Sequence, residues 1–279
     1  MKESEKMTKA KMFIVLLMVA ITSFGVGIAL MLSGDEYSYD DSGDSSLSEG
    51  GDCNVLGINL HGDLFTYIPS GNESDLLANT DVVSSDDLLY YLGQAEGDEN
   101  IKAVLVEVDS YGGVPVAGEE MADALKRFEK PSVAVVRQAG LSAAYYAISS
   151  ADRIFASKYS DVGSIGVTSS YLENINKDAR FIDLSSAKFK DAGDPNKALT
   201  AEERALFMRD IRIVHDNFVE AVSINRNIPI EKVKALADGS SVLGEKAKEL
   251  GLIDEIGGIY EAKKYLSEKI GEKVEVCWY

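Results

Sequence analysis

From residue 53 onward, short apolar runs alternate with segments whose apolar residues recur at helical spacing. Residues 54–60 (NVLGINL), 103–109 (AVLVEVD) and 132–138 (SVAVVRQ) are predicted to be buried strands. The segments between them, residues 84–95 and 116–128, are predicted to be amphipathic helices. Strands that alternate with helices in this way are typical of an α/β domain with crossover connections.

The second half of the chain is predicted to be mostly helical. Residues 141–151 (LSAAYYAISSA) are expected to form a helix that opens directly after the third strand. A long amphipathic helix is expected over residues 200–227, because Thr-Ala-Glu-Glu at its start is a capping-box pattern. Shorter helices near residues 229 and 244 are followed by a helix at 260–270 and a strand at 274–278. We find no internal repeat, so the sequence predicts one copy of the domain.

A stretch of 21 residues without charge, at positions 12–32, precedes the domain. At 1.5 Å per residue a helix of this length spans about 31 Å, which matches a bilayer core. We therefore predict one N-terminal transmembrane helix. The alternative is a cleaved secretory signal, but its apolar region is usually shorter and ALMLSG is a poor cleavage site.

Charge predicts the orientation of this helix and the nature of the segment after it. Four lysines lie in residues 1–11, whereas residues 33–52 carry seven acidic residues and no basic ones. The positive-inside rule then places the N-terminus on the cytoplasmic side of the cell membrane and the predicted folded domain, residues 53–279, on the outer side. The Ser/Gly/Asp-rich segment 33–52 is expected to be a flexible linker. The net charge of −18 argues against nucleic acid as a partner.

The two cysteines, Cys53 and Cys277, lie at the two ends of the predicted domain. Outside the cytoplasm a disulfide is permitted. If the first and last strands are neighbours, a bridge would stabilise the fold by about 4 to 5 kcal/mol in the loop-entropy model. Two unpaired buried thiols remain an equal alternative, because the sequence does not give their separation.

Two strand ends carry residues suited to acyl-transfer chemistry. In DSYGG, at residues 109–113, paired glycines follow a buried strand and can present backbone N–H groups to a developing oxyanion, although such a pair is more often only a turn. In QAGLSAAYY, at residues 138–146, Ser142 follows a strand and opens a helix, where an alkoxide is favoured. A plain helix N-cap is the alternative for Ser142.

The chain has only two histidines, so the base that would activate Ser142 is more readily a lysine. A triad with His215 and Asp216 is disfavoured, because adjacent helical residues point in different directions. The segment 185–195 (SSAKFKDAGDP), expected to be extended up to a final turn, offers Lys188 and Lys190. Alternation places both on one face, so periodicity does not choose between them.

Five motifs occur together in one order: DSYGG, GLSAAYY, ADRIFAS, VGSIGV and KFKDAG. Their order and spacing resemble the signal peptide peptidase A family, also called protease IV, and ADGSSVLGEKAKELGLIDEIGG is similar to its closing signature. The resemblance covers residues 55–260. It implies a Clp protease/crotonase-like fold with repeated β-β-α units and a serine peptidase with a Ser/Lys dyad that needs no cofactor.

Carried over to this sequence, the resemblance implies a role for six residues. Ser142 is expected to be the nucleophile and Lys190 the general base, with Ser164 orienting the lysine amine. The oxyanion hole is expected at the backbone of Gly112, Gly113 and Ala143.

The resemblance also implies an assembly and a substrate class. Single-copy members form rings in which the serine of one subunit meets the lysine of its neighbour, so a homo-oligomer is expected. The implied substrates are signal-peptide remnants and other small apolar peptides near the membrane. Alternatives are an inactive membrane scaffold of the same fold and a crotonase-type acyl-CoA enzyme, which the membrane anchor and the Ser/Lys pair disfavour.

Overall fold

The structure is a computed structural model that describes residues 53–68, 81–171 and 184–279. The predicted N-terminus, transmembrane helix and linker, at residues 1–52, lie outside these ranges and stay predictions. Within the described ranges, no helix is both long enough and apolar enough to cross a membrane.

The described residues contain one nine-stranded sheet with six strands in the order β2-β1-β3-β4-β5-β8. Strand β9 also pairs with β1, and β6 pairs with β4 and with β7. Every pairing in the described part is parallel except that of β6 with β7. The bounds are β1 Val55–Phe65, β2 Val82–Ser84, β3 Ala103–Gly113, β4 Ser132–Leu141, β5 Arg153–Ala156, β6 Asp161–Gly163, β7 Ser241–Leu243, β8 Glu255–Ile256 and β9 Val276–Trp278.

The predicted α/β class is confirmed, and the three predicted buried strands are β1, β3 and β4. Each continues further than its apolar run, to Phe65, Gly113 and Leu141. Strands β1 and β3 shift register between His61 and Asp63, and β3 and β4 shift between Val108 and Ser110. The expected repeat of β-β-α units stays a prediction, since each of these strands is continuous along its length.

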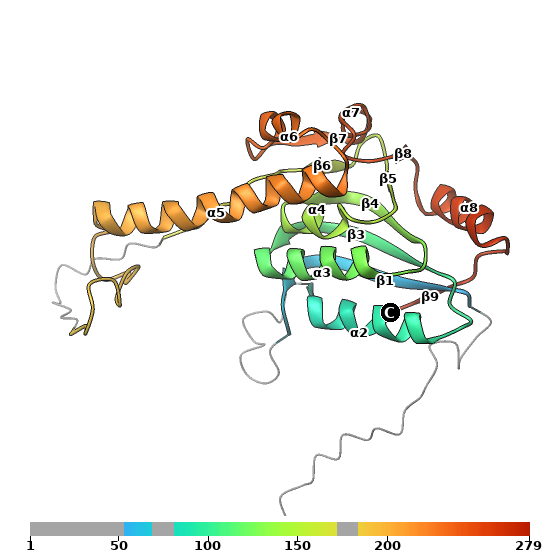
Figure 1. Cartoon of the computed structure of the whole chain (residues 1–279), viewed down its shortest axis with the longest axis horizontal. Coiled ribbons are helices and arrows are strands. Elements are labelled where there is room, and N and C mark those ends of the chain that lie inside the picture. The colour runs from blue at the N-terminus through green and yellow to red at the C-terminus, as the bar shows by residue number, and fades with distance from the viewer. Residues whose placement is uncertain (1–52, 69–80, 172–183) are drawn as a thin grey trace, which may run out of the picture. The chain divides into compact units, whose positions relative to one another are not determined.

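Helices cover both faces of the sheet (Figure 1). One face packs on α2, α3 and α4, and the opposite face packs on α8. Successive side chains of a strand point to opposite faces of the sheet, so in β1 Leu56 lies in the larger core and Val55 in the smaller one. The helices are α2 Ser85–Gly97, α3 Pro115–Arg127, α4 Ala143–Ile148, α5 Ala201–Asn225, α6 Ile230–Leu236, α7 Gly244–Leu250 and α8 Ile259–Ile270.

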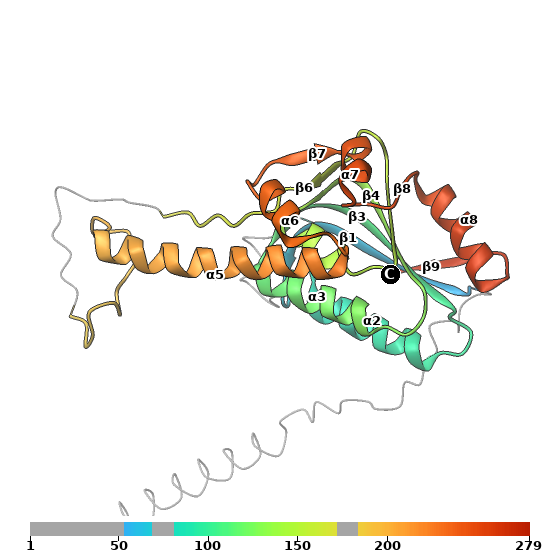
Figure 2. The ribbon, with the colours of Figure 1, turned by 45° about the horizontal axis from the view of Figure 1, so that its top comes forward.

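Helix α5 is capped at its N-terminus and packs into the core near its C-terminus (Figure 2). Its N-terminus has the predicted capping box: Thr200 Oγ1 accepts a hydrogen bond from the Glu203 N–H, and the Glu203 carboxylate accepts one from the Thr200 N–H. Towards its C-terminus, Phe218, Val219 and Val222 are buried. The helix of 25 residues, about 37 Å long, therefore joins the core to a segment at its other end.

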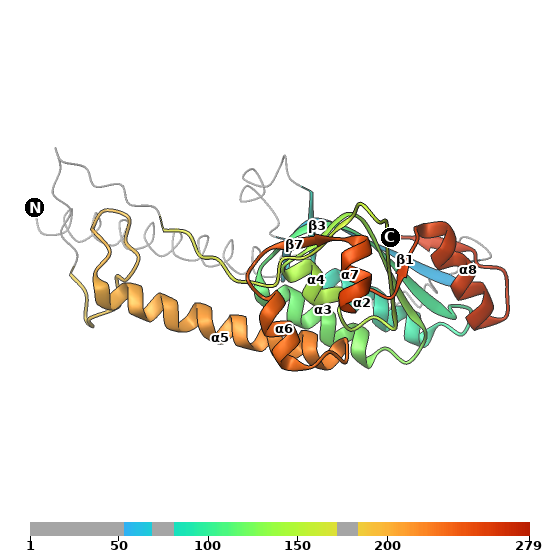
Figure 3. The same cartoon turned by 90° about the horizontal axis from the view of Figure 1, so that it is seen from above.

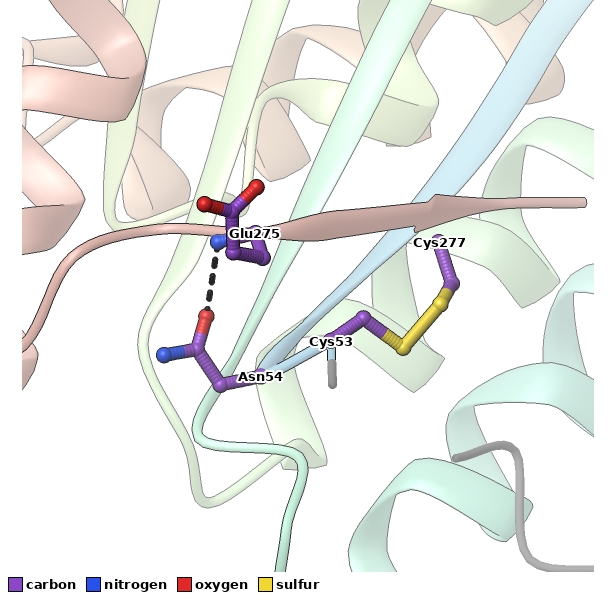
Figure 4. Close-up of a disulfide and its surroundings, with 4 residues drawn as sticks. All are labelled: Cys53, Asn54, Glu275 and Cys277. Carbon is purple, nitrogen blue, oxygen red and sulfur yellow. Dashed lines mark hydrogen bonds between the residues drawn. A yellow bond between two sulfur atoms is a disulfide. The ribbon is translucent and has the colours of Figure 1, made fainter. Parts of the chain in front are cut away.

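A disulfide closes the fold. Cys53 and Cys277 are bonded, with Cα atoms 5.7 Å apart (Figure 4). Beside it, the Glu275 N–H donates to Asn54 Oδ1 over 3.0 Å. The sequence left this pairing open, and it forms because β9 lies next to β1 in the sheet.

The same parallel arrangement brings three strand ends together. Ser110 of β3 is level with Gly140 of β4, and Leu141 of β4 is level with Gly163 of β6. The carboxyl ends of neighbouring parallel strands are where open α/β sheets bind ligands. The residues that follow these three strands form the candidate site.

Candidate active site

Ser142 lies between β4 and α4 in an unusual backbone conformation. Its φ is 52° and its ψ is −127°, a region that residues with a side chain rarely adopt. The Ser142 N–H donates to the Gly163 carbonyl over 2.8 Å, which ties this turn to the end of β6. Such strain persists only where neighbouring structure holds it, and it often marks functional sites. The predicted helix begins at Ala143, so Ser142 is at its N-terminal end as expected, but it makes no side-chain cap.

Gly112 of the DSYGG motif packs directly against Ser142, whereas Gly113 packs against the backbone of Leu64. Gly112 has a φ of +115°, and a Cβ on it would lie 2.8 Å from the Ser142 Cβ. Only glycine permits this approach. The structure therefore brings Gly112, Gly113, Ser142 and Ala143 together, and their roles in an oxyanion hole stay predictions.

The N–H groups at this junction are not equivalent. The Gly112 N–H donates to Ser110 Oγ over 3.1 Å, so it is already engaged. Ala143 is the first residue of α4, where an N–H has no acceptor within the helix. Gly113 and Ala143 line a cavity beside Ser142, whereas Gly112 does not.

This cavity has a volume of about 100 Å³ and is mostly apolar. Tyr146 of α4 and Phe218 of α5 stack there, with ring centroids 5.0 Å apart. Burial raises the pKa of Tyr146 to about 12, with Glu119 and Asp123 adding to the shift, so its hydroxyl stays neutral. The full lining is Gly113, Pro115, Ser142, Ala143, Tyr146, Gly166, Val167, Thr168, Val214 and Phe218.

The two tyrosines of α4, Tyr145 and Tyr146, lie in different environments. Tyr145 is fully buried and its hydroxyl donates to the Leu252 carbonyl over 2.9 Å. Burial raises the pKa of Tyr145 above its ordinary range. Tyr146 faces the cavity instead. Sequence reasoning missed the contribution of α5, although Val214 and Phe218 are four residues apart and so share a helix face.

Neither histidine lines the cavity beside Ser142. His215 Nε2 lies 3.1 Å from the Ala237 carbonyl, and its Nδ1 is 3.6 Å from the Asp216 carboxylate. His61 Nε2 is 3.3 Å from the Glu107 carboxylate on the sheet. Each histidine therefore has a contact of its own and neither is among the residues that line the cavity, although His215 and Asp216 lie closer together than the sequence argument against a triad assumed.

The segment that carries the candidate lysines forms turns, so its expected extended conformation is wrong. The Lys190 N–H donates to the Ala187 carbonyl, which curls the chain at KFK. Lys188 Nζ is 2.6 Å from the Glu202 carboxylate, and Lys197 Nζ is 2.9 Å from both Asp191 and Glu203.

Lys190 differs from the other two lysines of this segment. It is exposed, and within the described ranges no carboxylate pairs with it. Hydrogen bonds to Asp191 and Glu203 raise the pKa of Lys197, which keeps that side chain an ammonium. The ion pairs thus distinguish Lys190 from Lys188, which the periodicity of the sequence could not do.

Ser142 and Lys190 are not together in one chain of this structure. Lys190 precedes Asp191, which is linked through Lys197 to Glu203 at the start of α5. Phe218, which lines the Ser142 cavity, lies fifteen positions after Glu203, about 22 Å along the helix. Figure 3 shows the turn segment beside the N-terminal end of α5, away from α4.

Ser164 is close to the Ser142 turn but is not near the lysine segment either. It follows Gly163 at the end of β6, and its φ of 50° is again in the left-handed region. Its Oγ donates to the Gly239 carbonyl over 2.9 Å, and its N–H donates to the Ser240 carbonyl. The expected contact between this hydroxyl and the Lys190 amine stays a prediction.

Comparison with known proteins identifies the family. Residues 124–273, more than half of the chain, match the model of "Peptidase family S49". A protein of Methanocaldococcus jannaschii named "Putative protease MJ0651" is 30% identical over 267 residues, which cover 92% of this chain and 82% of that protein. A protein of Enterococcus faecium named "Putative signal peptide peptidase SppA" is 29% identical over 232 residues, covering 79% of this chain and 65% of that protein.

A solved structure supports the fold. The 1510-N membrane-bound stomatin-specific protease superposes with a TM-score of 0.52 at 14% identity, covering 82% of this chain and 98% of that one. At this identity the likeness concerns the fold alone. The family match and the sequence relatives carry the assignment: the chain belongs to peptidase family S49 and is a serine peptidase.

Proposed function

We propose that this serine peptidase is a membrane-anchored endopeptidase of the Clp protease/crotonase fold that uses Ser142 as nucleophile and Lys190 as general base. The observation that carries the proposal is the strained turn at Ser142. It presents a serine at the start of α4, against Gly112 and beside an apolar cavity.

The chemistry follows from these positions. A free lysine amine takes the Ser142 proton, and the alkoxide attacks the peptide carbonyl. Backbone N–H groups of Gly113 and Ala143, with Gly112 once its bond to Ser110 is released, stabilise the tetrahedral oxyanion. The lysine ammonium then gives its proton to the leaving amine, and water hydrolyses the acyl-enzyme.

We propose that two copies of the chain share each site. A lysine can act as a base only if its amine loses its water, and Lys190 is exposed in a single copy. A neighbouring copy that covers the turn at the start of α5 would both remove this water and supply Ser142. The separation along α5 within one chain supports this arrangement, since one copy alone leaves serine and lysine apart.

The cavity supports a substrate class. A volume of about 100 Å³ lined by Tyr146, Phe218 and Val214 suits a small or medium apolar side chain next to the scissile bond. We propose that such peptides, signal-peptide remnants among them, reach the site at the membrane surface, where the transmembrane helix predicted at residues 12–32 would anchor the chain. The Cys53–Cys277 disulfide supports a location outside the cytoplasm, because disulfides persist in oxidising compartments.

Labelling with a fluorophosphonate tests the dyad. The wild-type chain should be labelled, whereas Ser142→Ala and Lys190→Ala should not. Lys188→Ala is the matched control, because its side chain lies two residues away and pairs with Glu202. If Lys190→Ala were labelled as fast as wild type, the assignment of the base would be wrong. A wild-type chain that resists labelling would favour the inactive scaffold.

Mixing tests the shared site. Ser142→Ala and Lys190→Ala chains, dissociated together and reassembled, should recover activity, because some interfaces then join an intact serine to an intact lysine. Mixed assemblies, identified by a different affinity tag on each variant, that show no activity would refute a site shared between copies.

A further inference from the structure

Lys197 holds together the turn that carries Lys190 and the start of α5. Its Nζ lies 2.9 Å from Asp191 Oδ2 and 2.9 Å from Glu203 Oε1. Asp191 directly follows Lys190, and Glu203 is the capping-box residue of α5. This ammonium thus joins the turn to the helix. Lys188 makes a second link, to Glu202 of α5, but the two side chains of that pair are 61% and 65% exposed and so contribute little.

The cluster is built more firmly than an exposed ion pair. The Glu203 side chain is only 4% exposed, and its second oxygen accepts hydrogen bonds from the Thr200 N–H and Oγ1, over 2.9 and 2.8 Å. The turn is also held from another side, since the Tyr171 hydroxyl donates to the Asp194 carbonyl over 2.8 Å. A buried carboxylate with all its partners in place fixes one geometry, and removing its cation leaves an unpaired buried charge.

The cluster also occupies the carboxylate nearest to Lys190 in the sequence. The Lys197 ammonium lowers the pKa of Asp191 through a hydrogen bond, so this carboxylate is ionised and engaged. Without Lys197 the same charge would be free beside Lys190, where it would favour the ammonium form of the proposed base. Among the described residues 184–204, the other charged side chains are Lys188 with its partner Glu202, Asp194, which accepts from Asn196, and Arg204 on α5.

We propose that Lys197 is a positioning residue for Lys190: it fixes the KFKD turn on α5 and keeps the Asp191 carboxylate away from the Lys190 amine. The inference rests on the proposed role of Lys190 as base. Lys197 then has two separable effects: it places the turn that carries Lys190, and it holds the negative charge of Asp191 away from the Lys190 amine.

The test uses the full-length chain and the rate constant of fluorophosphonate labelling, measured as a function of pH. Lys197→Met should lower the rate near neutral pH by about 10²-fold, the effect of misplacing a catalytic group by about 1 Å, and should move the midpoint of the profile to higher pH. Lys197→Arg, which can still bridge two carboxylates, should restore most of the rate. Lys188→Met is the matched control and should leave both rate and midpoint unchanged.

Asp191→Asn separates the two effects. Alone it breaks the link that Lys197 makes between turn and helix but leaves Glu203 paired with Lys197, so the rate should fall without a rise in the midpoint. Combined with Lys197→Met it should return the midpoint to the wild-type value while the rate stays low. Asp191→Asn also serves as the test if Lys197→Met does not fold, and a wild-type rate in Asp191→Asn would then overturn the proposal.

Failure of this inference is distinguishable from failure of the dyad. If Lys197→Met keeps the wild-type rate and midpoint while Lys190→Ala is not labelled, the positioning role is wrong and the dyad stands. If Lys190→Ala is labelled at the wild-type rate, the dyad itself is wrong. A role in folding alone would lower the fraction of chains that label at the end of the reaction but not the rate constant, and that result would also overturn the proposal.

Discussion

Loss of the disulfide between Cys53 and Cys277 should destabilise the domain strongly, because the bond closes a long loop. The two residues are 224 positions apart. For a loop of this length the chain-entropy model gives a loss of about 18 cal/mol/K on cross-linking the unfolded chain, or about 5 kcal/mol at 25 °C. For a domain of this size, about 2–4 °C in Tm per kcal/mol predicts a fall of about 10–20 °C.

The assay is urea unfolding of the full-length chain in detergent, followed by tryptophan fluorescence. The chain has one tryptophan, Trp278, which lies in β9 next to the bond and packs against Gly57. Cys53→Ala, Cys277→Ala and the double variant should lose equal stability, and reduced wild-type protein should match them. A double variant within about 1 kcal/mol of the oxidised wild type would refute the reasoning, because it would mean that the unfolded chain gains little freedom when the loop is opened.

Three further predictions concern the site and the start of α5. Gly112→Ala should abolish labelling of Ser142 without unfolding the chain. The new Cβ would lie 2.8 Å from the Ser142 Cβ, and the φ of +115° at this position disfavours alanine. Labelling at the wild-type rate would contradict this packing. Phe218→Ala should enlarge the cavity and shift peptide preference towards larger apolar side chains. The measurement is the ratio of kcat/KM values across a peptide series. An unchanged ratio would show that Phe218 does not limit the size of the substrate side chain that the cavity accepts. The hydrogen bond from Lys197, with two further hydrogen bonds from Thr200, lowers the pKa of Glu203 from 4.5 to about 2, so the stability that this carboxylate contributes is complete above pH 4.5 and lost as the pH falls towards 2. Protease sensitivity of the turn segment should rise over that window in wild type and rise less in Lys197→Met, which keeps only the Thr200 hydrogen bonds; an equal rise in both would contradict the role of Lys197.

Local patterns predicted much of the fold. The apolar runs of β1, β3 and β4 are buried on both faces, so each reads as a strand from its own residues. The capping box of α5 is likewise local, since Thr200 and Glu203 are one helical turn apart. The strands β2, β5, β6, β7 and β8 were not predicted from periodicity, because runs of two to four residues are too short to show a period.

The candidate site was predicted in part. Ser142 and the glycine pair were found because each follows a buried strand, and parallel strands end at one edge. Their mutual contact needed the register of β3, β4 and β6, which no local pattern contains. The extended conformation expected around Lys190 was wrong because the turn is stabilised by Lys197 and Tyr171, both outside the KFK motif.

The sequence by itself determined the family, the α/β class and which residue types end the strands, because these depend on side chains that are neighbours along the chain. Only the tertiary structure decided that Cys53 meets Cys277, that Tyr146 faces the cavity while Tyr145 is buried, and that the lysine turn lies at the far end of α5 from Ser142. Each of these depends on which distant segments pack together. That choice is made by the burial of the whole sheet and its helices, so it is not contained in any one stretch of residues.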